Sequence, residues 1–139
     1  MKNTLMMALC GLGILAAGCT KPHQPDTLTL QGTWSGQEVG GRMPGSPSLV
    51  LEGAKLEFHG ANTNEWYRAT FSLREDTTPR QLEAVVTECP FPKYVGKTVH
   101  GIYTMEGGRL TFAANEPGNP LVPSSFDAKG SRKFVFTKK

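Results

Sequence analysis

From residue 28 to the end of the chain, hydrophobic and polar residues alternate in short stretches. The clearest stretch is 67–74, in which Tyr67, Ala69, Phe71 and Leu73 are separated by single polar residues. A period of two puts the four apolar side chains on one face of an extended strand, whereas a helix would spread them around all its sides. This stretch therefore predicts a half-buried β-strand.

The same alternation predicts strands at 33–39, 55–59, 82–87, 98–105, 110–114 and 133–137. The apolar run 49–51 is too short for its state to be assigned. Segments rich in Gly, Pro or Asn predict loops or turns at 40–48, 60–64, 89–96 and 115–125, and Gly107-Gly108 predicts a hairpin turn. No stretch after residue 28 predicts a helix of three turns.

Short strands with hairpin spacing predict an all-β domain, either a sandwich or a barrel. We favour a small antiparallel β-barrel of about seven or eight strands, because closure removes the exposed sheet edges that invite aggregation. About 110 residues can bury a core of their own without disulfides or metal. Cys89 is the single cysteine beyond residue 19, so this domain can form no internal disulfide.

Residues 1–18 have a different pattern. Lys2 precedes the apolar run 5–18, which ends in small residues. A positive start, an apolar run and small residues before a cleavage point are typical of a secretory signal helix. The run is shorter than the roughly 20 residues that a transmembrane helix needs. The alternatives are an ordinary signal followed by a chance cysteine, or an uncleaved membrane anchor.

Residues 15–19, Leu-Ala-Ala-Gly-Cys, resemble the lipobox of bacterial lipoproteins. The resemblance implies that the Cys19 thiol is joined to diacylglycerol, that the signal is cut before Cys19, and that the new amino group is acylated. Two or more acyl chains anchor a protein stably where one is marginal. Cys10 does not fit this pattern, because Leu9 precedes it where a small residue is required.

The predicted organisation is a lipoprotein signal peptide at 1–18, a lipidated tether at 19–27 and a barrel domain at 28–139. The tether is polar with two prolines, and it includes His23. The expected location is the cell envelope, on a membrane facing the periplasm or at the cell surface. Thr20 after the cysteine favours the outer membrane by resemblance to enterobacterial sorting.

Three stretches and a closing segment together resemble an uncharacterised domain family abundant in planctomycete-type bacteria. They are Leu-Gln-Gly-Thr-Trp at 30–34, Gly-Lys-Thr-Val-His-Gly-Ile-Tyr at 96–103, Leu-Thr-Phe-Ala at 110–113, and Pro120 and Phe126 before a basic strand. The resemblance covers 28–139, with residues 40–60 departing most from the pattern, and it brings no established activity.

The Gly-x-Trp opening also resembles the lipocalin-like superfamily, which implies a small antiparallel barrel. In lipocalins the tryptophan closes the base of the barrel, and an arginine on the last strand packs across it. The resemblance thus implies a structural pair of Trp34 and Arg132, the arginine being assigned by its position.

The net charge of +3 does not indicate nucleic-acid binding, because lysine and arginine are scattered along the chain. The densest basic segment is the C-terminal one, with Lys129, Arg132, Lys133, Lys138 and Lys139. We interpret it as the polar face and end of a terminal strand; attraction to anionic surfaces is the alternative.

His59, His100 and Cys89 are the candidate metal ligands, but they lack the spacings of zinc or copper sites. We expect no metal and no cofactor. Cys89 has apolar neighbours and no base close by in the sequence, which favours an inert thiol. The carboxylates are spread along the chain and no nucleophile motif occurs, so we do not expect an enzyme; a hydrolase is the least favoured reading.

A binding role fits the sequence best. Six aromatic residues could line a pocket or form the core, and both possibilities stay open: Trp34, Trp66, Tyr67, Phe71, Tyr103 and Phe112. The predicted function is a monomeric, membrane-anchored lipoprotein that binds a small apolar ligand or an envelope component. The alternative is a structural or protein-interaction module whose contact surface is formed by the loops 40–48, 89–96 and 115–125, with an exposed patch around Phe91 and Tyr94.

Overall fold

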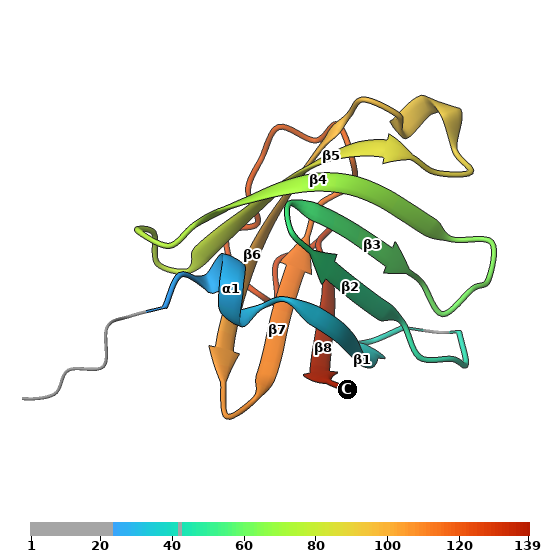
Figure 1. Cartoon of the computed structure of the whole chain (residues 1–139). Coiled ribbons are helices and arrows are strands. Elements are labelled where there is room, and N and C mark those ends of the chain that lie inside the picture. Colours follow the sequence, from blue (N-terminus) through green and yellow to red (C-terminus); the bar gives the residue numbers. More distant parts are fainter. Residues whose placement is uncertain (1–23, 42) are drawn as a thin grey trace, which may run out of the picture.

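Eight strands form one closed antiparallel barrel in a computed structural model that describes residues 24–41 and 43–139 (Figure 1). Each strand pairs with the next along the chain, and the last pairs with the first. In chain order the strands are β1 (Gly32–Glu38), β2 (Ser48–Glu52), β3 (Lys55–His59), β4 (Trp66–Arg74), β5 (Arg80–Glu88), β6 (Thr98–Glu106), β7 (Arg109–Ala114) and β8 (Arg132–Lys138). The prediction of a small all-β antiparallel barrel is confirmed.

Helix is limited in the described ranges to α1 (Asp26–Thr29) and the 3₁₀ turn η1 (Pro92–Tyr94). Strand β3 has the predicted bounds, and the unassigned run 49–51 is the centre of β2. The burial pattern along β5 alternates as predicted, with Leu82, Ala84 and Val86 buried. Alternation therefore located β3 and β5 but not β2, although Leu49 and Leu51 of β2 also face the core.

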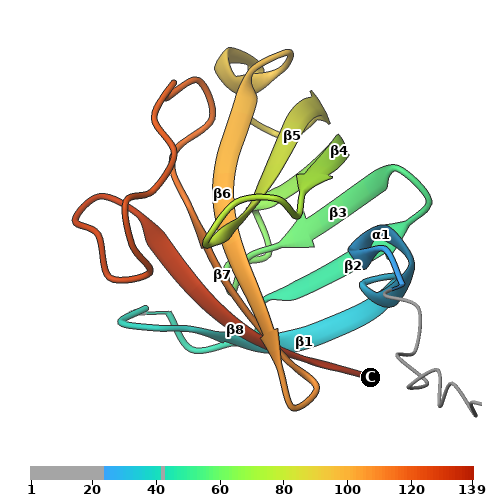
Figure 2. The same ribbon diagram turned by 90° about the vertical axis from the view of Figure 1, so that its left-hand side faces the viewer.

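The barrel has two unlike ends. Short turns join β2 to β3, β4 to β5 and β6 to β7 at the end beside α1, which we call the closed end (Figure 2). The longer connections 39–47, 60–65, 89–97 and 115–131 lie at the opposite end, which we call the open end. Since strands in a meander alternate in direction, every second connection falls at the same end.

Large side chains fill the closed half of the barrel. Trp34, Leu51, Leu110 and Phe136 point inward and are at most 2% exposed. The Trp34 indole Nε1 donates a hydrogen bond of 2.9 Å to the carbonyl oxygen of Leu30, so its one polar atom is satisfied. Full burial of a large apolar side chain stabilises a fold by about 1.5–3 kcal/mol. This half is the solid core.

A buried carboxylate fixes α1 to the barrel. Asp26 is 4% exposed, and its Oδ2 accepts hydrogen bonds from Tyr103 Oη at 2.7 Å and Arg80 Nη1 at 2.9 Å. The folded domain therefore begins at Asp26, and the prediction of a tether through residue 27 is wrong for Asp26 and Thr27. The remainder of the predicted tether that precedes residue 24, and Cys19 with it, lies outside the described residues.

The predicted pair of Trp34 and Arg132 is also wrong. Antiparallel pairing of β1 with β8 places Trp34 opposite Lys138 and Glu38 opposite Phe134, so Arg132 lies beyond the far end of β1. Lys138 occupies the position next to Trp34 that was predicted for Arg132. Its Nζ lies 5.4 Å from the centroid of the Trp34 ring and donates to the carbonyl of Thr29 at 3.1 Å.

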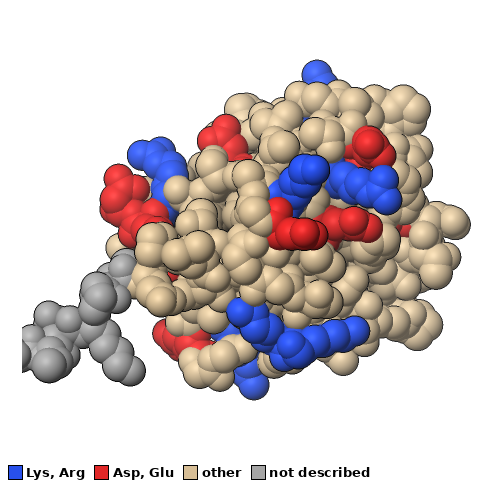
Figure 3. Space-filling model, in the orientation of Figure 1, with Lys and Arg blue, Asp and Glu red and all other residues tan. Residues whose placement is uncertain are grey.

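Charged side chains of both signs are interspersed on the face in Figure 3, with a group of basic side chains along its lower edge. The C-terminal basic residues do not act as one patch: Arg132 forms ion pairs with Glu38 and Glu65, and Lys133 pairs with Asp127. None of the helices in the described ranges is long and apolar enough to cross a membrane.

Candidate functional site

The open half of the barrel holds a cavity of about 330 Å³. Glu65, Tyr94 and residues 115–117 of the open-end loops line it, so the cavity reaches the open end. Its wall is mostly apolar and includes Leu49, Leu56, Phe58, Leu82, Val86, Val99, Phe112 and Phe134. This volume lies at the lower end of the range of about 300–1,000 Å³ for small-molecule sites.

Small inward-facing residues leave this space unfilled. Ala69, Ala84 and Ala114 line the cavity on three different strands. On β6, Gly101 lets the Phe112 ring lie across the strand: a Cβ at this position would be 2.6 Å from Phe112 Cε2. The closed half carries Trp34 and Phe136 at inward positions, so the hollow is confined to the open half.

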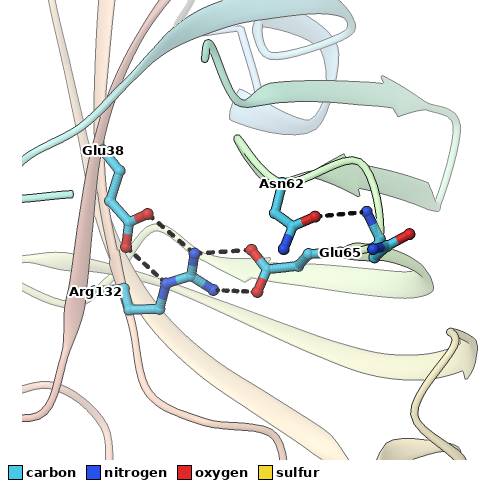
Figure 4. A network of polar contacts seen from close by, with 5 residues as sticks. Glu38, Asn62, Glu65 and Arg132 are labelled. Carbon is cyan, nitrogen blue, oxygen red and sulfur yellow. Dashed lines mark hydrogen bonds and ion pairs between the residues drawn. The ribbon is translucent and has the colours of Figure 1, made fainter. Parts of the chain in front are cut away.

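At the open end, Arg132 is held between two carboxylates (Figure 4). Its Nε and Nη2 donate to Glu38 at 2.8 and 3.1 Å, and its Nη2 and Nη1 donate to Glu65 at 2.8 and 3.1 Å. The guanidinium carbon also lies 5.9 Å from the Phe58 ring centroid and 5.1 Å from that of Phe134. The Arg132 guanidinium is thus hydrogen-bonded to both carboxylates and lies close to two aromatic rings.

The ion pairs further stabilise the charged form of this guanidinium. Burial alone would lower the pKa of Arg132, but hydrogen bonds and charge from Glu38 and Glu65 hold the pKa above its ordinary value. The side chain is 41% exposed, against 22% for Glu38 and 23% for Glu65. Arg132 therefore stays a cation whose charge is more than balanced by its two partners.

Backbone contacts fix the loop that carries Glu65. The Glu65 amide donates to the carbonyl of Asn62 at 2.9 Å, and the Gly60 amide donates to the Glu65 carbonyl at 2.9 Å. Asn62, which lies beside Glu65 in Figure 4, accepts a hydrogen bond of 3.0 Å at its Oδ1 from the Asn64 amide. These contacts position the Glu65 carboxylate for Arg132.

Three aromatic rings meet at the open end. The centroids of Tyr67, Phe91 and Tyr94 lie 5.9–6.3 Å apart, and Tyr94 Oη donates to the Glu116 carboxylate. Burial, and then the charge of Glu65, raise the pKa of Tyr67 to about 12. The hydrogen bond to Glu116 likewise raises the pKa of Tyr94. Both phenols are therefore neutral at physiological pH.

The six aromatic candidates from the sequence separate into three groups. Tyr67 and Phe112 line the cavity. Trp34, Phe71 and Tyr103 are buried in the core. Trp66 lies under the Arg68 guanidinium, whose carbon is 5.3 Å from the ring centroid.

Sequence reasoning missed Phe58, Phe134 and Glu65 as cavity residues and misassigned Arg132. Phe58 could have been found from its inward register, since it alternates with polar neighbours on a predicted strand, and Phe134 shares one face of its predicted strand with Phe136. Glu65 and Glu38 could not, because the approach of Glu65 to Arg132 depends on the geometry of a loop and that of Glu38 on the pairing of β1 with β8.

The candidate ligands for metals stay apart in the described part of the chain, where no three His, Cys, Asp or Glu side chains gather at ligand distances. His59 Nε2 pairs with Glu57 at 2.7 Å, and the Cys89 thiol donates to the Phe91 carbonyl at 3.1 Å.

Phe91 and Tyr94 are half-buried and pack on each other, so they do not form the exposed patch expected of an interaction module.

Comparisons of the chain with protein-family models, with curated proteins and with solved structures found no match. The function of the cavity is accordingly inferred from its geometry and chemistry.

Proposed function

We propose that this chain is a lipid-anchored binding protein whose barrel takes up one small, largely apolar ligand. The observation that carries the proposal is the cavity of about 330 Å³, which has an apolar wall and an opening with a few polar groups. Sites for small molecules combine these two features: burial of apolar surface supplies affinity, and the polar groups orient the ligand.

The geometry supports reversible uptake. Each Å² of apolar ligand surface that enters the cavity contributes about 25 cal/mol before the cost of immobilising the ligand. Fixed ion pairs hold Arg132 at the opening, so few protein groups need to be ordered when a ligand binds. A barrel of this size with a solid closed half has room for one small molecule.

The lipidated Cys19 remains part of this proposal and has a geometric consequence. The six residues 20–25 separate Cys19 from α1, so the Cα atoms of Cys19 and Asp26 lie at most about 25 Å apart. Because α1 packs at the closed end, the acyl chains would hold that end near the membrane and direct the cavity opening away from it.

Anchoring is tested by Cys19→Ala, which removes the sulfur atom proposed to form the thioether. We expect the variant to leave the membrane fraction and appear in the soluble envelope fraction. Persistent sedimentation with membranes of a Cys19→Ala protein that mass spectrometry shows to have lost residues 1–18 would contradict lipidation at this residue.

The second candidate, a protein-interaction module, is favoured by the exposed apolar residues of the open-end loops. Val39, Met43, Val95, Leu121 and Val122 are each at least 37% exposed. This candidate requires no ligand inside the barrel, so a ligand titration separates the two functions.

The titration uses N-phenyl-1-naphthylamine, an uncharged dye that fluoresces in apolar sites, with the soluble Cys19→Ala protein. We expect saturable binding of one dye per chain. Ala84→Phe places a ring in the cavity and should weaken binding at least tenfold, whereas Val85→Phe, on the outward face of the same strand, should leave binding unchanged.

Circular dichroism checks that each variant keeps the barrel. If Ala84→Phe does not fold, Ala114→Phe at the opening serves instead, since Ala114 is only partly buried. No saturable dye binding by the folded protein, or equal binding by the inward and outward variants, would contradict the proposal.

A further inference from the structure

Negatively charged groups outnumber positively charged groups at the cavity. Glu65 and Glu116 line it as carboxylates, and Glu38 adds a third through its ion pair with Arg132. Arg132 is the one Lys or Arg among the lining residues in the described chain. Lys93 lies outside the lining, exposed, with Nζ 4.8 Å from the Tyr94 ring centroid. The opening therefore has an excess of negative charge.

Arg132 has little capacity left for an anionic ligand. A guanidinium has five N–H donors, and four hydrogen bonds already run from Arg132 to Glu38 and Glu65. A ligand carboxylate could not form the usual bidentate pair without displacing one of these side chains. It would also enter the field of three carboxylates, and like charges at a site are a strong means of rejecting a partner.

The same opening favours a cationic ligand group. Tyr67 and Tyr94 line the cavity as neutral phenols, with Glu65 and Glu116 beside them. Aromatic faces attract ammonium groups, most strongly where water is excluded, and nearby carboxylates add to that attraction. Lys93 over the Tyr94 ring already shows this contact on one face of the cluster.

We propose that the cavity binds a small apolar amine, with its tail against the cavity wall and its ammonium group at the opening beside Tyr67, Tyr94, Glu65 and Glu116. This inference rests on the proposed function, and it names the ligand class: a protonated amine with an apolar body, as opposed to a fatty acid of the same length.

The test displaces bound N-phenyl-1-naphthylamine with three compounds that share an eight-carbon chain: octylamine, octanol and octanoate. At pH 7.5 and low salt we expect octylamine to displace the dye at a concentration at least tenfold lower than octanoate, and lower than octanol. Raising the ionic strength should narrow the difference between octylamine and octanoate, because screening weakens a charge-based preference.

Glu116→Gln removes one negative charge and keeps an oxygen that can accept from Tyr94. It should weaken octylamine binding about threefold to tenfold and leave octanol unchanged. Glu65→Gln should in addition strengthen octanoate binding, because it releases part of the Arg132 donor set. Glu83→Gln, on the exposed face of β5, is the matched control and should alter none of the three affinities.

Two kinds of failure are distinguishable. If no dye binds, the proposed function fails. If the dye binds but octanoate or octanol competes as well as octylamine, or if Glu116→Gln behaves like Glu83→Gln, the binding protein stands and the assignment of an amine ligand is overturned.

Discussion

Gly36→Ala is expected to lower the free energy of unfolding by more than about 3 kcal/mol, out of a total of about 5–15 kcal/mol for a domain of this kind. A Cβ at Gly36 would lie 1.8 Å from the carbonyl oxygen of Val135 and 2.8 Å from Phe136 Cα. Both contacts are with backbone, so no side-chain rotation relieves them. The pairing of β1 with β8, which closes the barrel, would have to separate.

Urea denaturation followed by tryptophan fluorescence measures this loss. Ser35→Ala on the same strand is the matched control, because Ser35 accepts the hydrogen bond from Thr137 with its backbone carbonyl, which the substitution keeps. It should change stability by less than about 0.5 kcal/mol. Equal urea midpoints for Gly36→Ala and Ser35→Ala would show that the two strands are not closely packed at this point.

Asp26→Ala is expected to lower the free energy of unfolding by about 2–4 kcal/mol. The substitution leaves Arg80 without its partner and the Tyr103 hydroxyl, on a side chain only 1% exposed, without its acceptor. Burial, followed by the hydrogen bond to Asp26, raises the pKa of Tyr103, so this phenol stays neutral in the native state. The closed end would also lose these two side-chain contacts with α1, although Lys138 would still donate to the carbonyl of Thr29.

Two further variants serve as controls for Asp26→Ala. Asp26→Asn keeps an acceptor for Tyr103 and should cost less than Asp26→Ala. Asp76→Ala removes a carboxylate that is 79% exposed and 3.9 Å from Arg74, so its effect should be small. If thermal unfolding of Asp26→Ala matched that of Asp76→Ala, α1 would not contribute to the stability of the barrel.

Much of the fold could be predicted from alternation alone. Strands such as β4 and β5 have one face toward the core and one toward solvent. Their sequences therefore alternate between apolar and polar residues with a period of two. Strand β2 gave no such signal: its short apolar centre, Leu49-Val50-Leu51, does not alternate with polar residues. Pairing with its neighbours in the sheet, β1 and β3, makes this segment a strand.

The polar features of the site could not be predicted, because they depend on contacts between residues far apart in sequence. Asp26 meets Tyr103 across 77 positions, and Arg132 meets Glu38 across 94. A resemblance to lipocalins placed Arg132 at Trp34, but the register of β8 brings Lys138 there instead. Register between the first and last strands is a property of the closed barrel and not of either segment.

The cavity itself had a sequence signal that is visible once the register is known. Ala69 and Ala84 occupy inward positions where a filled barrel would carry larger side chains. Alanine at such positions is equally compatible with a tightly packed core, so the hollow follows only from the combination of several strands.

The location of a bound ligand is measured most directly by nuclear Overhauser effects between N-phenyl-1-naphthylamine and the methyl groups of the soluble Cys19→Ala protein. We predict contacts from the dye to Leu49, Leu82 and Val86 inside the barrel. Contacts confined to the exposed loop residues Leu121 and Val122, with none to the inward-facing methyl groups, would contradict a binding site within the barrel.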